Sequence, residues 1–163
     1  MDCLIIWLMF INLISQSSFS MLAPFYPSVA KNERGMSSSI VGVVMSLFSV
    51  SFVLTSFLIG TRLGRIGRRR SMYIGIIIQS ASIVGFGCLI WVKDKTTFML
   101  LSFALRLIGG VACAFICVTA YAMTSIRYPD NLQSKISLLE AANGAGMFVG
   151  PIFGGLIYQY TSF

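Results

Sequence analysis

GMFVGPIFGG, residues 146–155, is the stretch that decides the fold of this chain. Its glycines recur at helical spacing, at Gly146, Gly150 and Gly154 with Gly155 alongside, so one face of a helix has no side chains and another helix backbone can approach it closely. Pro151 removes a hydrogen-bond donor and bends the helix. So much glycine weakens a helix in water, whereas membrane helices use it for packing. The stretch therefore predicts a membrane protein with several spans, the fifth of which is bent.

The composition of the chain supports a membrane location. Of its 163 residues 56% are hydrophobic and 10% are charged, whereas a soluble domain carries about 25% charged residues. The net charge of +7 does not indicate nucleic-acid binding, because five of the twelve basic residues lie at 62–70, between two apolar runs. Membrane topology explains that cluster better, so we expect no nucleic acid as a partner.

Five apolar runs predict five transmembrane helices. They cover residues 4–29, 40–60, 72–92, 98–124 and 136–158, and each has the roughly 20 residues that a ~30 Å hydrocarbon core requires. The first run is not a signal peptide, because it follows Asp2 rather than a basic segment and is too long. The predicted fold class is an all-α membrane protein whose single domain is a partial bundle of five helices.

The basic residues are spread unevenly over the predicted loops. The loops after the second and fourth spans carry seven, namely the five at 62–70 with Arg127 and Lys135, and the loops after the first and third spans carry four. The positive-inside rule places the richer side, and with it the N-terminus, in the cytoplasm. This rule explains the five arginines at 62–70 without any further role.

The four cysteines lie in or beside apolar runs, and the chain contains no histidine. Cys113 and Cys117 share a helix face, but two thiols do not make a metal site, so we interpret the cysteines as small buried apolar residues. We expect no metal and no cofactor. With no nucleophile–base pair in the pattern, the sequence also argues against an enzyme.

Two charges lie inside the predicted spans, where charges are costly and often functional. At ~1.5 Å per residue, Arg106 lies about 12 Å into the fourth span and Glu140 about 6 Å into the fifth. Arg106 either fixes helix packing or belongs to a site. Glu140 either extends toward the interface beside Lys135, or is a protonatable group that binds a cation and a proton in alternation. A direct pair between them requires offset or tilted helices.

The first span is unusually polar. Asn12 and Gln16 are four residues apart and therefore share a face, which in lipid must point at protein or water. They either line a cavity or form hydrogen bonds between helices. Pro24 and Pro27 should kink or end this helix. Further candidates for a cavity wall are Thr119, Tyr121 and Asn143.

Together these patterns resemble the first half of a major facilitator superfamily transporter. The predicted loop after the second span is similar to the signature G-x-L-x-D-R-x-G-R-[RK], residues 106–110 resemble R-x-x-x-G, and residues 146–155 match the antiporter signature G-x-x-x-G-P-x-x-G-G. The resemblance links Arg106 to proton coupling. It also assigns a cytoplasmic gate to the loop, through Gly60, Arg65, Gly67, Arg68 and Arg69. Arg62 replaces the usual leucine and Gly64 the usual aspartate, so the gate lacks that carboxylate here.

Within that family the chain is similar to the vesicular amine transporters, and especially to their polyamine-type branch. The similarity rests on the sequence MLAPFYP at residues 21–27 and on Leu139 and Glu140 before the glycines. Ser15 stands where monoamine members carry an aspartate, which argues against a monoamine substrate. The resemblance implies alternating access between two bundles, with the bent fifth helix at their interface. Glu140 would then exchange a proton for a small organic cation, with the proton gradient as the driving force.

Members of this family have roughly twelve spans, so we expect this chain to be a fragment that lacks the C-terminal half of a transporter. Two functions remain open. The first is proton-coupled antiport of small organic cations, which are amine, polyamine-like or drug-like, in a vesicular, endomembrane or plasma membrane. The second is a non-transporting membrane protein that assembles with or regulates a full-length transporter.

Overall fold

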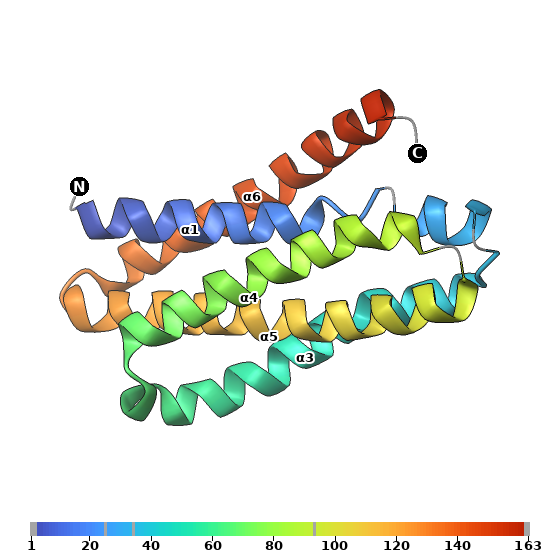
Figure 1. The fold of residues 1–163 in the computed structure, drawn as a ribbon. Helices are drawn as coiled ribbons and strands as arrows, with labels where there is room; N and C mark the ends of the chain where they lie inside the picture. The colour runs from blue at the N-terminus through green and yellow to red at the C-terminus, as the bar shows by residue number, and fades with distance from the viewer. Residues whose placement is uncertain (1–2, 25, 34, 93, 162–163) are drawn as a thin grey trace.

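The computed structural model describes residues 3–24, 26–33, 35–92 and 94–161, which form a bundle of long helices (Figure 1). Five of these helices are long and apolar enough to cross a membrane: α1 (Cys3–Ser20), α3 (Ser38–Ile66), α4 (Arg68–Cys88), α5 (Lys95–Arg127) and α6 (Leu132–Thr161). Short segments join some of them: α2 (Tyr26–Ser28), the π-helix η1 (Val29–Glu33) and the 3₁₀-helix η2 (Leu89–Trp91). The described residues form no strand, and the predicted all-α fold class is confirmed.

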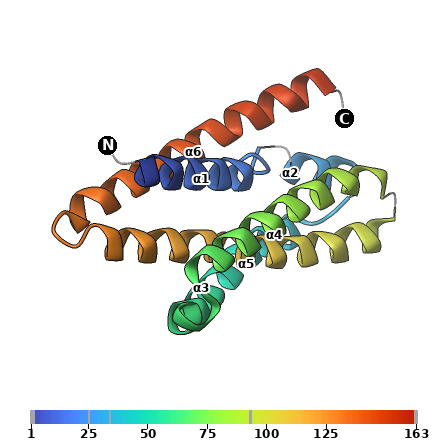
Figure 2. The same cartoon turned by 60° about the vertical axis from the view of Figure 1, so that its left-hand side comes forward.

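Helix α5 is the core of the bundle. It packs along α3 and α4 and also contacts α1. Half of its most apolar window is buried inside the bundle, against 22–28% for the other four long helices. Helix α6 packs along α1 and touches α5 through few residues, as the turned view in Figure 2 also indicates. The position of α6 therefore depends mainly on its contact with α1.

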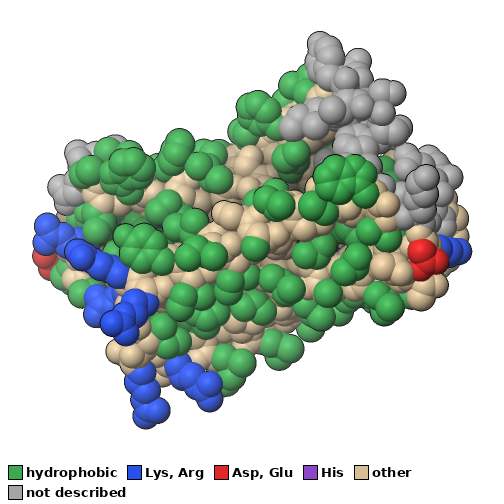
Figure 3. All heavy atoms as spheres, viewed as in Figure 1, with side chains coloured by type: hydrophobic (Ala, Val, Ile, Leu, Met, Phe, Trp, Pro, Cys, Tyr) green, Lys and Arg blue, Asp and Glu red, His purple; other side chains and the backbone are tan. Residues whose placement is uncertain are grey.

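The outer surface of the bundle is apolar. Hydrophobic side chains cover its length, whereas Lys and Arg gather toward its ends (Figure 3). Large side chains such as Phe57, Ile77 and Phe148 are 76%, 68% and 79% exposed. A soluble protein rarely exposes so continuous an apolar surface, and lipid is the solvent that suits it. The chain is therefore a multi-pass membrane protein.

The first helix is shorter than the predicted 4–29 span. It ends at Ser20, and the chain turns over the next four residues before α2 and η1. Pro24 explains this position, because it has no N–H to donate to the carbonyl of Ser20 four residues earlier. The N–H of Ala23 instead donates a hydrogen bond to the carbonyl of Ser20, at 3.1 Å, and this bond closes a tighter turn.

The predicted loop after the second span is mostly helical. Helix α3 continues to Ile66 and α4 begins at Arg68, so Gly67 alone separates them. Its φ of 85° is readily adopted only by glycine. The predicted third span, 72–92, runs past the end of α4 into η2. The predicted second, fourth and fifth spans lie inside α3, α5 and α6. Helix ends carry solvated polar residues, and hydropathy alone does not detect them.

Asp94 provides the N-cap of α5. Its carboxylate accepts hydrogen bonds from the hydroxyl of Thr97 at 2.7 Å and from the backbone N–H of Thr97 at 2.8 Å. These two bonds hold the pKa of Asp94 below its usual value. Because the folded pKa is lowered, the cap stabilises the fold above the ordinary aspartate pKa of about 3.9, and this stabilisation is lost as the pH falls through the lowered value.

We therefore expect Asp94→Ala to lower the midpoint of thermal unfolding by a few degrees near neutral pH and by much less at about pH 2. Asp94→Ser keeps a capping acceptor, so it should retain most of the stability and lose the pH dependence. Thermal unfolding of the purified protein measures both effects. An Ala variant that is as stable as the parent at neutral pH would contradict the role of the cap.

Candidate functional site

A row of polar side chains runs along α5 where this helix meets α1 and α6. Cys113, Cys117 and Tyr121 are spaced four residues apart, so they share one helix face. The two thiols are buried, and their sulfurs lie 3.9 Å apart. We call this row and its partners the polar track: Asn12, Ser15, Gln16, Cys113, Cys117, Tyr121, Glu140 and Asn143.

Helix α1 supplies one side of the polar track. Asn12 is 1% exposed; its amide donates to the carbonyl of Leu8 at 2.8 Å, and its side-chain oxygen accepts from Cys117 at 3.6 Å. The side-chain oxygen of Gln16 accepts from Cys113 at 3.8 Å. Hydrogen bonds to thiols are weak, but each gives a polar group of α1 a partner inside the bundle. These two residues therefore face protein rather than lipid.

Helix α6 supplies the only carboxylate of the polar track, Glu140. The hydroxyl of Tyr121 donates to Oε1 of Glu140 at 2.6 Å, and the amide of Asn143 donates to the same hydroxyl at 2.9 Å. Glu140 is exposed, and Asn143 is buried with its side-chain oxygen lacking a partner among the described residues. Lys135, which was expected beside Glu140, lies over the ring of Tyr128, with its Nζ atom 5.4 Å from the ring centroid.

The structure keeps Arg106 apart from this group. It precedes Tyr121 by fifteen residues on α5, about 22 Å along the helix. The direct pair with Glu140 is therefore not formed. Thr119, another candidate for the cavity wall, also lies elsewhere, because its hydroxyl donates to Ser71 of α4 at 2.8 Å.

Arg106 lies in a box of aromatic rings. It is 2% exposed, and its guanidinium carbon is 5.4, 6.0 and 5.3 Å from the ring centroids of Phe19, Tyr26 and Phe86. Its Nη2 is 2.8 Å from the sulfur of Met45. Among the described residues this cation meets no carboxylate, and its Nε has no hydrogen-bond partner. Cation–π contacts offset only part of the desolvation of such a charge.

Because the cation–π contacts do not fully offset the desolvation of the guanidinium, the effect of replacing Arg106 by Met can be predicted. The variant fills a similar volume and removes a buried cation that has no counter-charge nearby among the described residues, so its unfolding midpoint should equal or exceed that of the parent. Thermal unfolding in detergent measures this, with Phe48→Ala as a control for lost packing. A large fall in the midpoint of Arg106→Met would show that the arginine stabilises the bundle.

Three of the four signature glycines of α6 face α1 or the residue that follows it. A Cβ atom added at Gly146 or Gly150 would collide with the backbone of α1, and one at Gly154 would collide with the backbone of Met21, just past the end of that helix. One at Gly155 would meet no atom of the described residues within 4 Å. Ser20 also donates to the carbonyl of Gly146 at 3.2 Å. Pro151 lies within α6, between these contacts. The close packing expected between two bundles is thus formed, for three of the glycines, inside this one.

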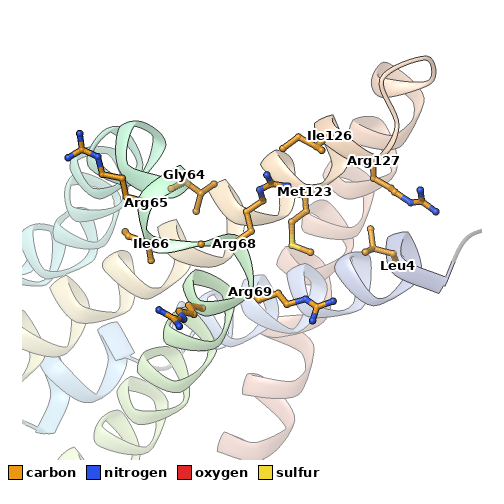
Figure 4. Close-up of a pocket in the computed structure, with 12 residues that line it drawn as sticks. Leu4, Gly64, Arg65, Ile66, Arg68, Arg69, Met123, Ile126 and Arg127 are labelled. Atoms are coloured by element: carbon orange, nitrogen blue, oxygen red, sulfur yellow. The ribbon is translucent and has the colours of Figure 1, made fainter.

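The proposed gate residues gather at one end of the bundle. Arg65, Gly67, Arg68 and Arg69 line a hollow at the α3–α4 junction (Figure 4), whereas Gly60 lies in α3, outside its lining.

Two of the cysteines belong to the polar track, which was not expected from the sequence. Cys3 and Cys88 are exposed, so the view of all four as buried apolar residues was wrong. The spacing of Cys113, Cys117 and Tyr121 is the signal that places the two thiols beside the site.

Comparison with known proteins gives a consistent result. The family model described as Major Facilitator Superfamily matches residues 8–163. The chain is 29% identical over 149 residues to the MFS-type transporter SLC18B1 of Homo sapiens, which covers 91% of this chain and 32% of that protein. It is 29% identical over 144 residues to Multidrug resistance protein 1 of Bacillus subtilis (strain 168), and the match covers 87% of this chain and 35% of that protein.

A third relative is the vesicular acetylcholine transporter of Mus musculus, which is 27% identical over 147 residues, with 89% of this chain and 25% of the relative covered. The chain therefore spans about a third of the length of these relatives, or less. No solved structure matches the chain significantly.

Proposed function

Because this chain belongs to the Major Facilitator Superfamily, we propose that its protein exchanges protons for small organic cations across a membrane. The observation that carries this proposal is the group formed by Glu140, Tyr121 and Asn143 on the polar track. The names of two relatives, a vesicular acetylcholine transporter and a multidrug resistance protein, support an organic substrate, and acetylcholine is itself a cation.

The chemistry of this group suits a cation. Tyr121 occupies one oxygen of Glu140, which leaves the second oxygen and the side-chain oxygen of Asn143 as acceptors without partners among the described residues. An ammonium group with N–H donors matches two such acceptors, and the carboxylate supplies the opposite charge. A proton on the carboxylate cancels that charge and weakens the binding of the cation. Competition for one group therefore couples the two fluxes in opposite directions.

The position of Glu140 allows alternating access. It is exposed on the side of the bundle, where α6 meets α5, rather than sealed in the core. We propose that a second bundle closes over this face and that rocking of the two bundles opens the site to each side in turn. Arginines and lysines gather at the end where the N-terminus lies (Figures 1 and 3), which supports a cytoplasmic N-terminus.

The test is transport by the protein as its gene encodes it, purified and reconstituted in vesicles with an acidic lumen. Uptake is measured for a panel of polyamines, monoamines and cationic drugs, with and without an ionophore that collapses the pH gradient. We expect uptake of at least one cation that requires the gradient. Uptake insensitive to the gradient would reject proton exchange. No uptake of any member would reject transport of these cations and favour a role as a partner of another transporter.

A further inference from the structure

The basic end of the bundle contains a hollow of about 850 Å³, which we call the basic hollow (Figure 4). Twelve residues from α1, α3, α4 and α5 and from the junction at Gly67 line it, and none of them is acidic. Five are arginines, and all five are exposed. They are Arg65, Arg68, Arg69, Arg70 and Arg127. The positive-inside rule accounts for basic residues at this end, but it does not account for a concave site lined by them.

The first turn of α4 adds a second feature that favours an anion. This 21-residue helix begins at Arg68, and no side chain caps it. The backbone N–H groups of the first turn of a helix have no partner inside the helix, and the helix dipole makes this end partially positive. Arg68, Arg69 and Arg70 belong to that turn, so backbone donors and guanidinium groups lie together beside the hollow. Phosphate groups are bound by this combination elsewhere in proteins.

The remaining lining is apolar and distinguishes between kinds of anion. Leu4 of α1, Ile66 of α3, and Met123 and Ile126 of α5 line the same hollow as the arginines. In Figure 4 the side chain of Arg68 lies toward Met123, whereas Arg65 points away from the other labelled residues. A small soluble anion gains nothing from the apolar residues. A molecule with a phosphate joined to a hydrocarbon part fits both kinds of lining.

We propose that the basic hollow binds the headgroup of an anionic phospholipid. The phosphate lies against Arg68, Arg69 and the first turn of α4, and the first part of the acyl chains lies along Leu4 and Met123. The hollow is at an end of the bundle, where the headgroups of the surrounding bilayer lie. Anionic lipids are concentrated in the cytoplasmic leaflet, which agrees with the orientation proposed for the N-terminus.

Native mass spectrometry of the purified protein tests this with two lipids that have the same acyl chains. We expect dioleoyl phosphatidylserine to bind more tightly than dioleoyl phosphatidylcholine, and Arg68→Gln to weaken phosphatidylserine binding about fivefold. Arg62→Gln removes the same charge from α3 outside the lining and is the matched control. Equal weakening by the two variants would overturn the proposal, because it would indicate general charge attraction without a site.

Gly64 offers an independent test from inside the hollow. It lines the hollow, and a Cβ atom there would meet no atom of the described part of the chain within 4 Å, so a larger side chain fits. Gly64→Asp places a negative charge among the arginines and should reduce phosphatidylserine binding at least as much as Arg68→Gln. Gly64→Asn has nearly the same shape and should leave binding close to that of the parent. Unchanged binding by the Asp variant, or equal loss with Asn, would contradict an electrostatic site.

The source of the phosphate is tested with glycerophosphoserine, which has the phosphatidylserine headgroup without acyl chains. We expect it to compete poorly, because it cannot use the apolar lining. Equally tight binding of glycerophosphoserine would replace the lipid by a soluble organic phosphate and overturn the proposal.

Discussion

Replacing Glu140 by Gln should reduce cation uptake driven by a pH gradient by roughly 100-fold, to the background of vesicles without protein. The variant loses the charge that attracts the cation and the group that carries the proton, so exchange has no common site. Uptake into vesicles with an acidic lumen, measured as an initial rate, checks this. Uptake that keeps the rate and pH dependence of the parent would remove Glu140 from the mechanism.

The structure predicts that this variant stays folded. A glutamine oxygen at the same place still accepts the hydrogen bond from Tyr121, and Glu140 is exposed, so no buried group loses its partner. The amount of protein in the membrane and its unfolding midpoint should therefore match those of the parent. If both fall sharply, the loss of uptake reflects misfolding and the proposed role is not supported.

Asp130→Asn is the matched control for Glu140→Gln. Asp130 lies in the exposed turn between α5 and α6, outside the polar track, and the change removes the same charge. We expect normal uptake from this variant.

Tyr121→Phe adds a graded comparison, because it keeps the carboxylate and removes only its hydroxyl donor and the partner of Asn143. Its uptake should fall less than that of Glu140→Gln, by roughly 10-fold.

The fold was predictable because the length of an apolar run decides whether a helix crosses lipid. The helix ends were not. The effect of Pro24 appears four residues earlier, at Ser20, and α3 extends through a segment with two arginines because a helix can leave the bilayer without unwinding. Charged residues mark the edge of the membrane, whereas Gly67 marks the end of the helix.

The grouping of the candidate residues was predictable in part. Asn12, Gln16, Tyr121, Glu140 and Asn143 meet on the polar track, because a polar side chain in an apolar span must face protein or water. The role of Arg106 was left open by the sequence, which allowed a direct pair with Glu140 only for offset or tilted helices. The fifteen residues between Arg106 and Tyr121 on α5 separate the arginine from this group by about 22 Å along the helix.

Replacing Gly150 by Leu should separate α6 from α1 and stop transport. A Cβ atom at this position already collides with the backbone carbonyl of Ser17 and with the side-chain hydroxyl of Ser20, and the carbonyl cannot move without displacing α1. Overpacking of this kind costs about 1–3 kcal/mol or more. Because α6 touches α5 through few residues, its displacement also breaks the contact between Tyr121 and Glu140. Uptake should fall to background, and the unfolding midpoint should drop by several degrees.

Gly155→Leu separates this wedge from a general effect of leucine in α6. Gly155 belongs to the same signature, but an added Cβ atom there meets nothing within 4 Å among the described residues. Gly144 has equally open surroundings among the described residues, about 1.7 turns before Gly150, so Gly144→Leu extends the comparison to the other side of the contact. Both variants should keep an unfolding midpoint close to that of the parent.

If Gly150→Leu is as stable as these two and transports normally, the glycine contact with α1 is not required for the fold or for the site. If Gly155→Leu is stable and still inactive, that face of α6 moves against a second bundle during transport, which is the alternating access proposed for this protein.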